Sequence, residues 1–168
     1  MLILFSVLRF LHIIAGILWA GGALTMSFFV APTMGATGDA GKQFAGYLMA
    51  KTRFSTFMMV NAVITVLAGS ILYGIDSNWF QSAWMHSPTG IGFGVGALTG
   101  IVAFVFGGML GNINKALGML GAQIQGKPTA DQLTALQALM ARQANASKWN
   151  TVFMLITIVL MASARLFG

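Results

Sequence analysis

Residues 4–31 read LFSVLRFLHIIAGILWAGGALTMSFFVA, an apolar stretch in which Arg9 is the only residue charged at neutral pH. About 20 mainly apolar residues are enough for a helix to cross the hydrocarbon core of a bilayer. The stretch lacks the basic n-region and the small-residue cleavage site of a signal peptide. We therefore predict a retained membrane-spanning helix, which we expect to stop at Pro32 because proline cannot continue the helical hydrogen bonding.

Three further segments have the length and apolar character of membrane spans. The chain is 57% hydrophobic and only 7% charged, whereas soluble domains carry about 25% charged residues. No strand-like alternation occurs, and lipid admits only helices and closed barrels. The sequence therefore predicts an all-α fold, a four-helix transmembrane bundle formed by a single domain over residues 1–168. The predicted spans are residues 4–31, 54–75, 90–111 and 149–166.

Basic residues are concentrated in two of the three predicted loops. The loop between the second and third spans, residues 76–89, has no Lys or Arg. By the positive-inside rule the two basic loops are cytoplasmic, so both termini and residues 76–89 face outward. We predict a multi-pass protein of the cell inner membrane with its N-terminus and C-terminus outside. The basic loop residues are Lys42, Lys51, Arg53, Lys115, Lys127, Arg142 and Lys148.

The loop between the third and fourth spans has apolar residues at helical spacing on both sides of a breaker, residues 126–129. Thr129 followed by Gln132 reads as a capping box, the start signal of a helix. We expect the third and fourth helices to extend past the membrane as an antiparallel cytoplasmic hairpin, with arms of roughly 20 Å. Such a hairpin is compatible with a docking surface for a partner, but a plain hairpin with an apolar seam explains the pattern as well.

Several function classes are excluded by the composition. The chain has no cysteine, which rules out disulfides, thiolate metal sites and iron–sulfur clusters. Its net charge is +6, but no run of Lys and Arg interleaved with aromatics points to nucleic acid. Glutamate is absent and the three aspartates lie in or beside loops, so no carboxylate relay crosses the membrane. No Walker loop or dinucleotide-binding glycine fingerprint is present.

One stripe of the first span carries Arg9, His12, Gly16 and Trp19 at helical spacing. Ionisable residues inside a membrane are costly and usually functional. Neutral imidazole is a common ligand for haem iron and for copper, Gly16 leaves room for a flat macrocycle, and Arg9 suits haem propionates. A histidine hydrogen-bonded to a neighbouring helix explains His12 equally well. Arg165 lies at the same level, where pairing with a carboxylate or extension to water accounts for it.

The second histidine, His86, lies beside Met85 in the outward loop. The predicted topology places His12 and His86 near the same membrane face, so the two are candidate metal ligands. A surface loop histidine is the simpler interpretation of His86. Thioethers suit Cu(I), but the twelve methionines are scattered and most are expected to pack between helices.

The second and third spans carry small and polar residues at a spacing of four. Glycine at this spacing is mainly a helix-contact motif. The groove that such residues form is also able to accept the edge of a porphyrin or a quinone. The residues are Asn61, Thr65, Gly69 and Tyr73 in the second span, and Gly92, Gly96 and Gly100 in the third.

Leu11-His12, Trp19, Gly21-Gly22 and Val30-Ala31-Pro32 together resemble the first helix of CopD-like membrane proteins, the copper-resistance D group. They are also similar to the HemJ-type protoporphyrinogen oxidases, which are small four-helix haem proteins. In those relatives a first-span histidine is followed seven residues later by tryptophan, a spacing that His12 and Trp19 match. The resemblance covers about the first quarter of the chain, and the charged segment of HemJ-type oxidases is missing. It implies a site centred on His12 that holds haem b rather than copper.

Three hypotheses follow. The first is a haem b-binding membrane protein with a redox or electron-transfer role, whose site near the outer face has His12 as axial ligand. Arg9 would hold a propionate, and Gly16 and Trp19 would shape the pocket. The second is an accessory structural subunit without a cofactor, and the third is a copper-handling protein that uses Met85, His86 and His12. In each case the surroundings are the lipid bilayer, and the chain is expected to form a homo-oligomer or to join a larger membrane complex.

Overall fold

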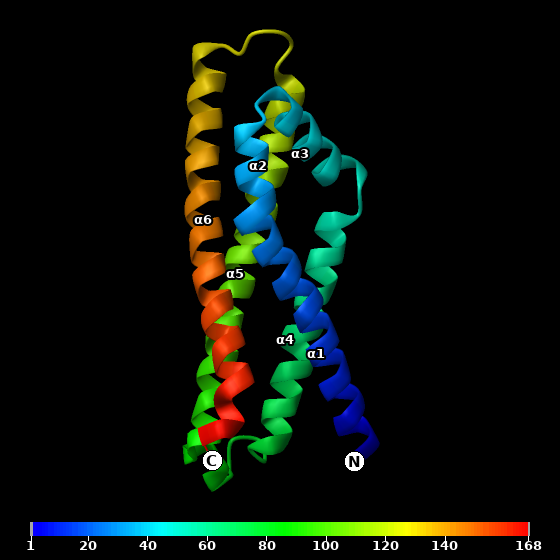
Figure 1. The fold of residues 1–168 in the computed structure, drawn as a ribbon, viewed down its shortest axis with the longest axis vertical. Helices are drawn as coiled ribbons and strands as arrows, with labels where there is room; N and C mark the ends of the chain where they lie inside the picture. Colours follow the sequence, from blue (N-terminus) through cyan, green and yellow to red (C-terminus); the bar gives the residue numbers. More distant parts are fainter. Residues whose placement is uncertain (1, 168) are drawn as a thin grey trace.

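The computed structural model describes residues 2–167, and within that range the chain is almost entirely helical with no strand. Figure 1 shows long helices that run side by side, with both termini at one end of the molecule. The elements are α1 (Leu2–Thr25), a π-helical segment η1 (Met26–Val30), α2 (Ala31–Ala36), α3 (Asp39–Lys51), α4 (Phe54–Asp76), a 3-10 turn η2 (Ala83–His86), α5 (Pro88–Gln123), α6 (Ala130–Ser163) and a 3-10 turn η3 (Ala164–Phe167).

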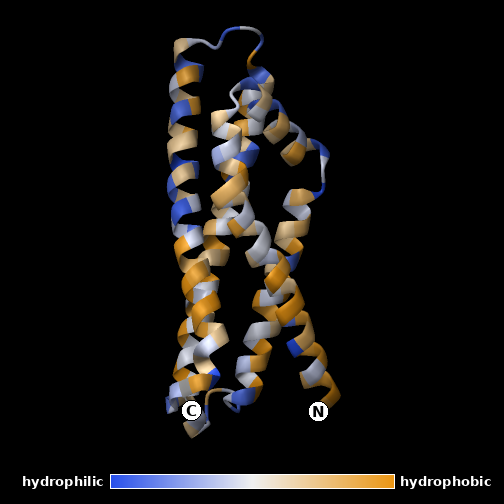
Figure 2. Cartoon of the chain, viewed as in Figure 1, coloured by the Kyte–Doolittle hydropathy of each residue, from blue (hydrophilic) through white to orange (hydrophobic). Residues whose placement is uncertain are grey.

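Within residues 2–167, four helices are long and apolar enough to cross a membrane: Leu2–Ala36, Phe54–Asp76, Pro88–Gln123 and Ala130–Leu166. Many large apolar side chains on these helices are exposed, and Figure 2 shows that hydrophobic residues predominate in the half of the molecule that contains the chain termini. In water such a surface would be unstable, whereas lipid is an apolar solvent that covers it. These helices confirm the predicted all-α fold with four membrane-spanning candidates.

The first long helix does not end at Pro32, contrary to the expectation from the sequence. Its path continues through η1 and α2 to Ala36. In η1 the Ala31 amide donates to the Met26 carbonyl, five residues back. Pro32 then falls in the first turn of α2, where a missing N–H leaves no helical bond unmade. The helix therefore continues past the proline by way of one π-helical turn.

The π-helical segment also connects α1 to α6 through hydroxyl groups. Ser27 Oγ lies 3.3 Å from Ser147 Oγ, and Thr151 Oγ1 donates to Ser27 Oγ at 2.9 Å. Hydrogen bonds between membrane helices contribute about 0.6 kcal/mol each on average. This contact fixes the position of the first helix against α6 on the side away from the chain termini (Figure 1).

The helices pack as two pairs, α1 with α4 and α5 with α6. In the second pair a Cβ added to Gly92 would lie 3.0 Å from Cβ of Ala164, and one added to Gly100 would lie 3.3 Å from Cγ2 of Thr157. Glycine therefore sets the close approach of α5 to α6, as predicted for the glycines at spacing four. Buried Asn150 donates to the Ala103 carbonyl across the same contact at 2.7 Å.

The two pairs meet in one buried layer. It consists of Trp19 from α1, Ala62 from α4, Ala103 from α5 and Met154 from α6. Trp19 packs edge-to-face on Phe104, with ring centroids 6.3 Å apart. Toward the chain termini α1 diverges from α5 and α6 (Figure 1), and the candidate site lies between the two pairs.

The predicted helix start at residue 129 is confirmed. Thr129 accepts from the Gln132 amide, while the Gln132 side chain accepts from the Thr129 amide, so both halves of the capping box are present. From this cap α6 runs beside α5 along most of its length. The segment that joins them lies at the end of the molecule opposite to both termini (Figure 1).

Replacing Gly92 by alanine should destabilise the α5–α6 pair. The new Cβ would lie 3.0 Å from Cβ and 3.3 Å from Cα of Ala164 at the start of η3, so that turn must move by a few tenths of an ångström. We expect a loss of about 1–3 kcal/mol in the free energy of unfolding, measured by thermal unfolding in detergent followed by circular dichroism. Gly111, whose added Cβ meets nothing within 4 Å, is the control. Gly111→Ala should leave stability unchanged or raise it by up to about 1 kcal/mol; equal effects at both positions would contradict the packing argument.

Candidate cofactor site

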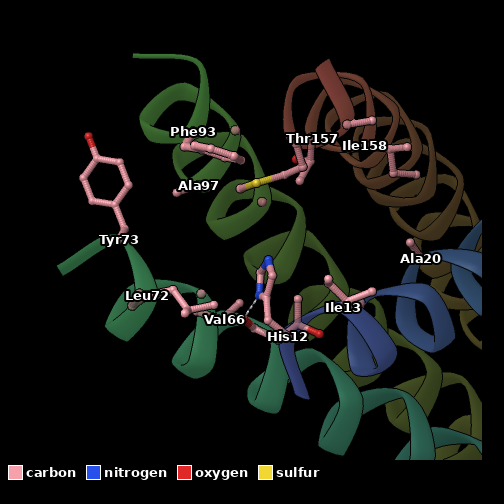
Figure 3. A pocket seen from close by; sticks show the side chains of 18 of the residues that line it. His12, Ile13, Ala20, Val66, Leu72, Tyr73, Phe93, Ala97, Thr157 and Ile158 are labelled. Atoms are coloured by element: carbon pink, nitrogen blue, oxygen red, sulfur yellow. Dashed lines mark hydrogen bonds between the residues drawn. The ribbon is translucent and has the colours of Figure 1, made fainter. Parts of the chain in front are cut away.

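A cavity of about 750 Å³ lies between α1, α4, α5 and α6, on the side of the buried layer that is nearer to the chain termini. Its walls are mainly apolar, and Figure 3 shows Leu72, Phe93 and Ile158 among the side chains that line it. The sequence-predicted stripe of Arg9, His12, Gly16 and Trp19 lines this cavity in full.

His12 is held by a backbone group of the neighbouring helix. Its Nδ1 lies 2.8 Å from the carbonyl oxygen of Thr65 in α4. A carbonyl can only accept, so Nδ1 carries the proton, and in the neutral imidazole Nε2 then keeps its lone pair. No hydrogen bond joins Nε2 to any of residues 2–167. Nε2 is not fully buried, because every buried side-chain nitrogen or oxygen in these residues has a hydrogen-bond partner. Figure 3 shows the ring extending from α1 into the cavity.

Gly69 creates the space that this hydrogen bond needs. A Cβ at residue 69 would lie 2.6 Å from Cε1 and 2.8 Å from Nδ1 of His12, distances that no side chain tolerates. The imidazole therefore rests directly on the backbone of α4, with the Thr65 carbonyl one turn away. Thr65 and Gly69 belong to the small-and-polar stripe of the second span, which the sequence explains as a helix-contact motif. Nothing in the sequence separates that role from support of a histidine, because the supporting atom belongs to the backbone.

Gly16 contributes to the same contact from the side of α1. A Cβ at residue 16 would lie 3.5 Å from Cγ2 of Thr65, which is ordinary van der Waals contact. The Thr65 hydroxyl is satisfied within its own helix, since it donates to the Asn61 carbonyl at 2.7 Å. Gly16 thus lies beside the histidine support and lines the cavity, and alanine would fit there.

Trp19 has two roles in the structure. It is only 5% exposed and belongs to the buried layer in which the four helices meet. It also lines the cavity, at the end where the helix pairs converge. Its indole therefore forms the inner limit of the cavity.

Two arginines line the cavity near the chain termini. Arg9 comes from α1 and Arg165 from η3, and both are exposed. Asp76, the last residue of α4, also lines the cavity, and the charge of both guanidinium groups acts on its carboxylate. None of the three forms a salt bridge within the described chain, where the ion pair is Lys42–Asp39 on α3. The cavity thus has an apolar interior, with two guanidinium groups and one carboxylate at one end.

The cavity is open toward the surroundings of the bundle between α1 and α6. Ile13 and Ile17 line it from α1 and are 45% and 62% exposed, and Ile158 lines it from α6 and is 39% exposed. α1 and α6 contact each other little. For helices that span a bilayer, this opening faces the lipid chains, so a lipid-soluble ligand has a direct route of entry.

His86 lies outside this cavity. It is exposed on η2 and is not among the lining residues, although Trp84 of the same turn is. The structure therefore does not bring His12 and His86 together in one pocket. Within residues 2–167, no group of three or more histidine, aspartate or glutamate side chains lies close enough to hold a metal ion. A metal bound by His12 must take its other ligands from different groups.

Comparison of the chain with family models, with curated proteins and with solved structures found no match. The resemblance of the first span to CopD-like and HemJ-type proteins therefore stays a prediction. The chemistry of the site must therefore be argued from its own residues. These are one imidazole held by a backbone carbonyl, two guanidinium groups and the apolar side chains that enclose the cavity.

Gly69→Ala should release the imidazole from α4. The added Cβ overlaps the ring, so the bond to the Thr65 carbonyl must break. In a His86→Gln background, which leaves one histidine, ring-nitrogen NMR should report the neutral Nδ1–H tautomer for the parent protein. Gly69→Ala should lose that single state, whereas Gly16→Ala should retain it because its Cβ makes only ordinary contact. Retention of the Nδ1–H tautomer in Gly69→Ala would contradict this account.

Proposed function

We propose that this chain is an integral membrane protein that binds haem b through His12 and serves in electron transfer. The observation that carries the proposal is the Nδ1 bond of His12 to the Thr65 carbonyl, which leaves Nε2 available in an apolar cavity. Metal-ligating histidines almost always donate their other ring N–H to a carbonyl or carboxylate, which fixes the ring and raises its basicity.

The cavity suits a flat amphiphile with anionic groups at one edge. Its volume of about 750 Å³ falls in the range of roughly 300–1,000 Å³ that is typical of cofactor and ligand sites. The apolar walls suit a macrocycle, and Arg9 suits a propionate because guanidinium binds carboxylate in a bidentate manner. Haem b would supply a one-electron redox centre at this position. The chain itself contributes the ligand, the apolar enclosure and the cationic end.

The proposed orientation places this site near the outer face of the cell inner membrane. It is supported by the absence of Lys and Arg from residues 76–89 and by the basic residues in 42–53 and 115–148, which favour the cytoplasmic side. In this orientation both termini are outside. The ends of α5 and α6 around residues 124–129 then extend into the cytoplasm as a helical hairpin, available to a second copy or to another subunit of a larger membrane complex.

Copper handling is the competing function for the same histidine. It is supported by the two methionines that line the cavity with His12, Met154 and Met161, since thioether and imidazole together suit Cu(I). His86 and Met85 do not contribute to that cavity. An accessory subunit without cofactor is the third possibility, and it predicts protein that co-purifies with fixed partners and carries neither metal nor chromophore.

His12→Ala should abolish haem binding. Protein expressed with ample haem and purified in detergent should show a Soret band, which His12→Ala loses or reduces at least about tenfold, since even a lost outer-shell partner costs 10–100-fold. His86→Ala is the matched control and should keep the full band, because His86 lies outside the cavity. Metal analysis of the same samples separates iron from copper. Colourless parent protein, or equal loss in both variants, would refute the proposal.

A further inference from the structure

Of the described residues that line the cavity, few others offer a donor atom to a metal. The Tyr73 hydroxyl donates to the Gly90 carbonyl at 3.3 Å, and Asp76 lies at the cationic end beside Arg9 and Arg165. Two methionines remain, both on α6. Met154 is 1% exposed and belongs to the buried layer with Trp19, whereas Met161 is partly exposed to the cavity. Met161 is therefore the one well-placed thioether.

Met161 and His12 line the same cavity from two different helices, α6 and α1. On α1, His12 follows Arg9 by three residues, about 4.5 Å along the helix, and Met161 of α6 precedes Arg165 of η3 by four residues. Arg9, Asp76 and Arg165 all line the cavity. The start of α1 and the end of α6 lie at the same end of the molecule (Figure 1). Each of these two chain segments thus carries one arginine near the chain terminus. Each also carries one potential iron ligand about one helical turn away from that arginine.

The side chain of Met161 lies along the wall of the cavity. Its Cγ and Cε would be 3.5 and 3.2 Å from a Cβ placed on Gly96, a residue that itself lines the cavity. The sulfur is bonded to both of these carbons, so it also lies over Gly96. Figure 3 shows the imidazole of His12 extending toward the side of the cavity from which Thr157, one turn from Met161 on α6, projects.

We infer that Met161 is the second axial ligand, with Arg165 the second propionate contact, so that α1 and α6 hold the haem from opposite sides. This inference rests on the proposed haem function. His/Met ligation is a known haem coordination, and the thioether raises the reduction potential relative to two nitrogen ligands. Because α1 and α6 contact each other little, a haem held in this way would also bridge the two helix pairs.

The experiment compares Met161→Leu with Met154→Leu in haem-loaded protein. Both changes remove a cavity methionine from α6 while nearly conserving volume, which the fold should tolerate. The ferric parent protein should show a low-spin spectrum with the sulfur-to-iron charge-transfer band in the near infrared. Met161→Leu should retain haem, lose that band, turn high-spin and titrate at a lower midpoint potential. Met154→Leu should keep the parent spectrum and potential.

The outcomes separate the two claims. If the parent protein binds no haem, the proposed function fails and this inference fails with it. If haem binds and depends on His12, but Met161→Leu leaves spectrum and potential unchanged, the inference alone is overturned. Arg165→Gln should weaken haem binding to the same extent as Arg9→Gln; an effect confined to Arg9→Gln would overturn the assignment of Arg165.

Discussion

The hydrogen bond from His12 to the Thr65 carbonyl is the constraint on which the site depends. Hydrocarbon offers no water to hydrogen-bond with an imidazole N–H. An N–H left without a protein acceptor there would destabilise the folded protein by about 1–3 kcal/mol. The carbonyl is reachable only because Gly69 leaves the surface of α4 bare at that point. One glycine and one backbone oxygen thus decide which nitrogen carries the proton and in which direction the lone pair of the other points.

The cavity itself is a consequence of where the small residues lie. Gly69 and Gly16 draw α1 onto α4, while Gly92 and Gly100 draw α5 onto α6. Within each pair the two helices pack directly on each other. The two pairs contact each other mainly in the buried layer that includes Trp19. Toward the chain termini the pairs contact each other through Tyr73 of α4, whose hydroxyl donates to the Gly90 carbonyl of α5, while lipid chains solvate the remaining apolar helix faces as well as protein does. A space between the pairs, lined by apolar side chains, therefore carries little energetic penalty in a bilayer.

Much of this arrangement can be predicted from the sequence. The features that cannot be predicted depend on backbone geometry, which residue types do not specify. Hydropathy predicts the four long apolar helices, helical spacing predicts that Arg9, His12, Gly16 and Trp19 share a face, and side-chain chemistry predicts the cap at Thr129. The passage of the first helix through Pro32 was not predictable, because it depends on a π-helical turn that no residue type specifies. The support of His12 was hidden as well, since a carbonyl oxygen is present at every position of the chain.

The free nitrogen of His12 bears most directly on function. An accessory subunit would be stabilised by any residue that fills the space between the helix pairs, and a leucine or phenylalanine would do so without burying a polar atom away from water. Instead, the chain places the imidazole of His12 there. Its Nδ1 is hydrogen-bonded to the Thr65 carbonyl, and its ring lines an apolar cavity that has cationic groups at one end. Polar atoms kept in hydrocarbon at an energetic cost usually mark a functional site. The proposed cofactor-binding role would use Nε2 of this imidazole as a ligand.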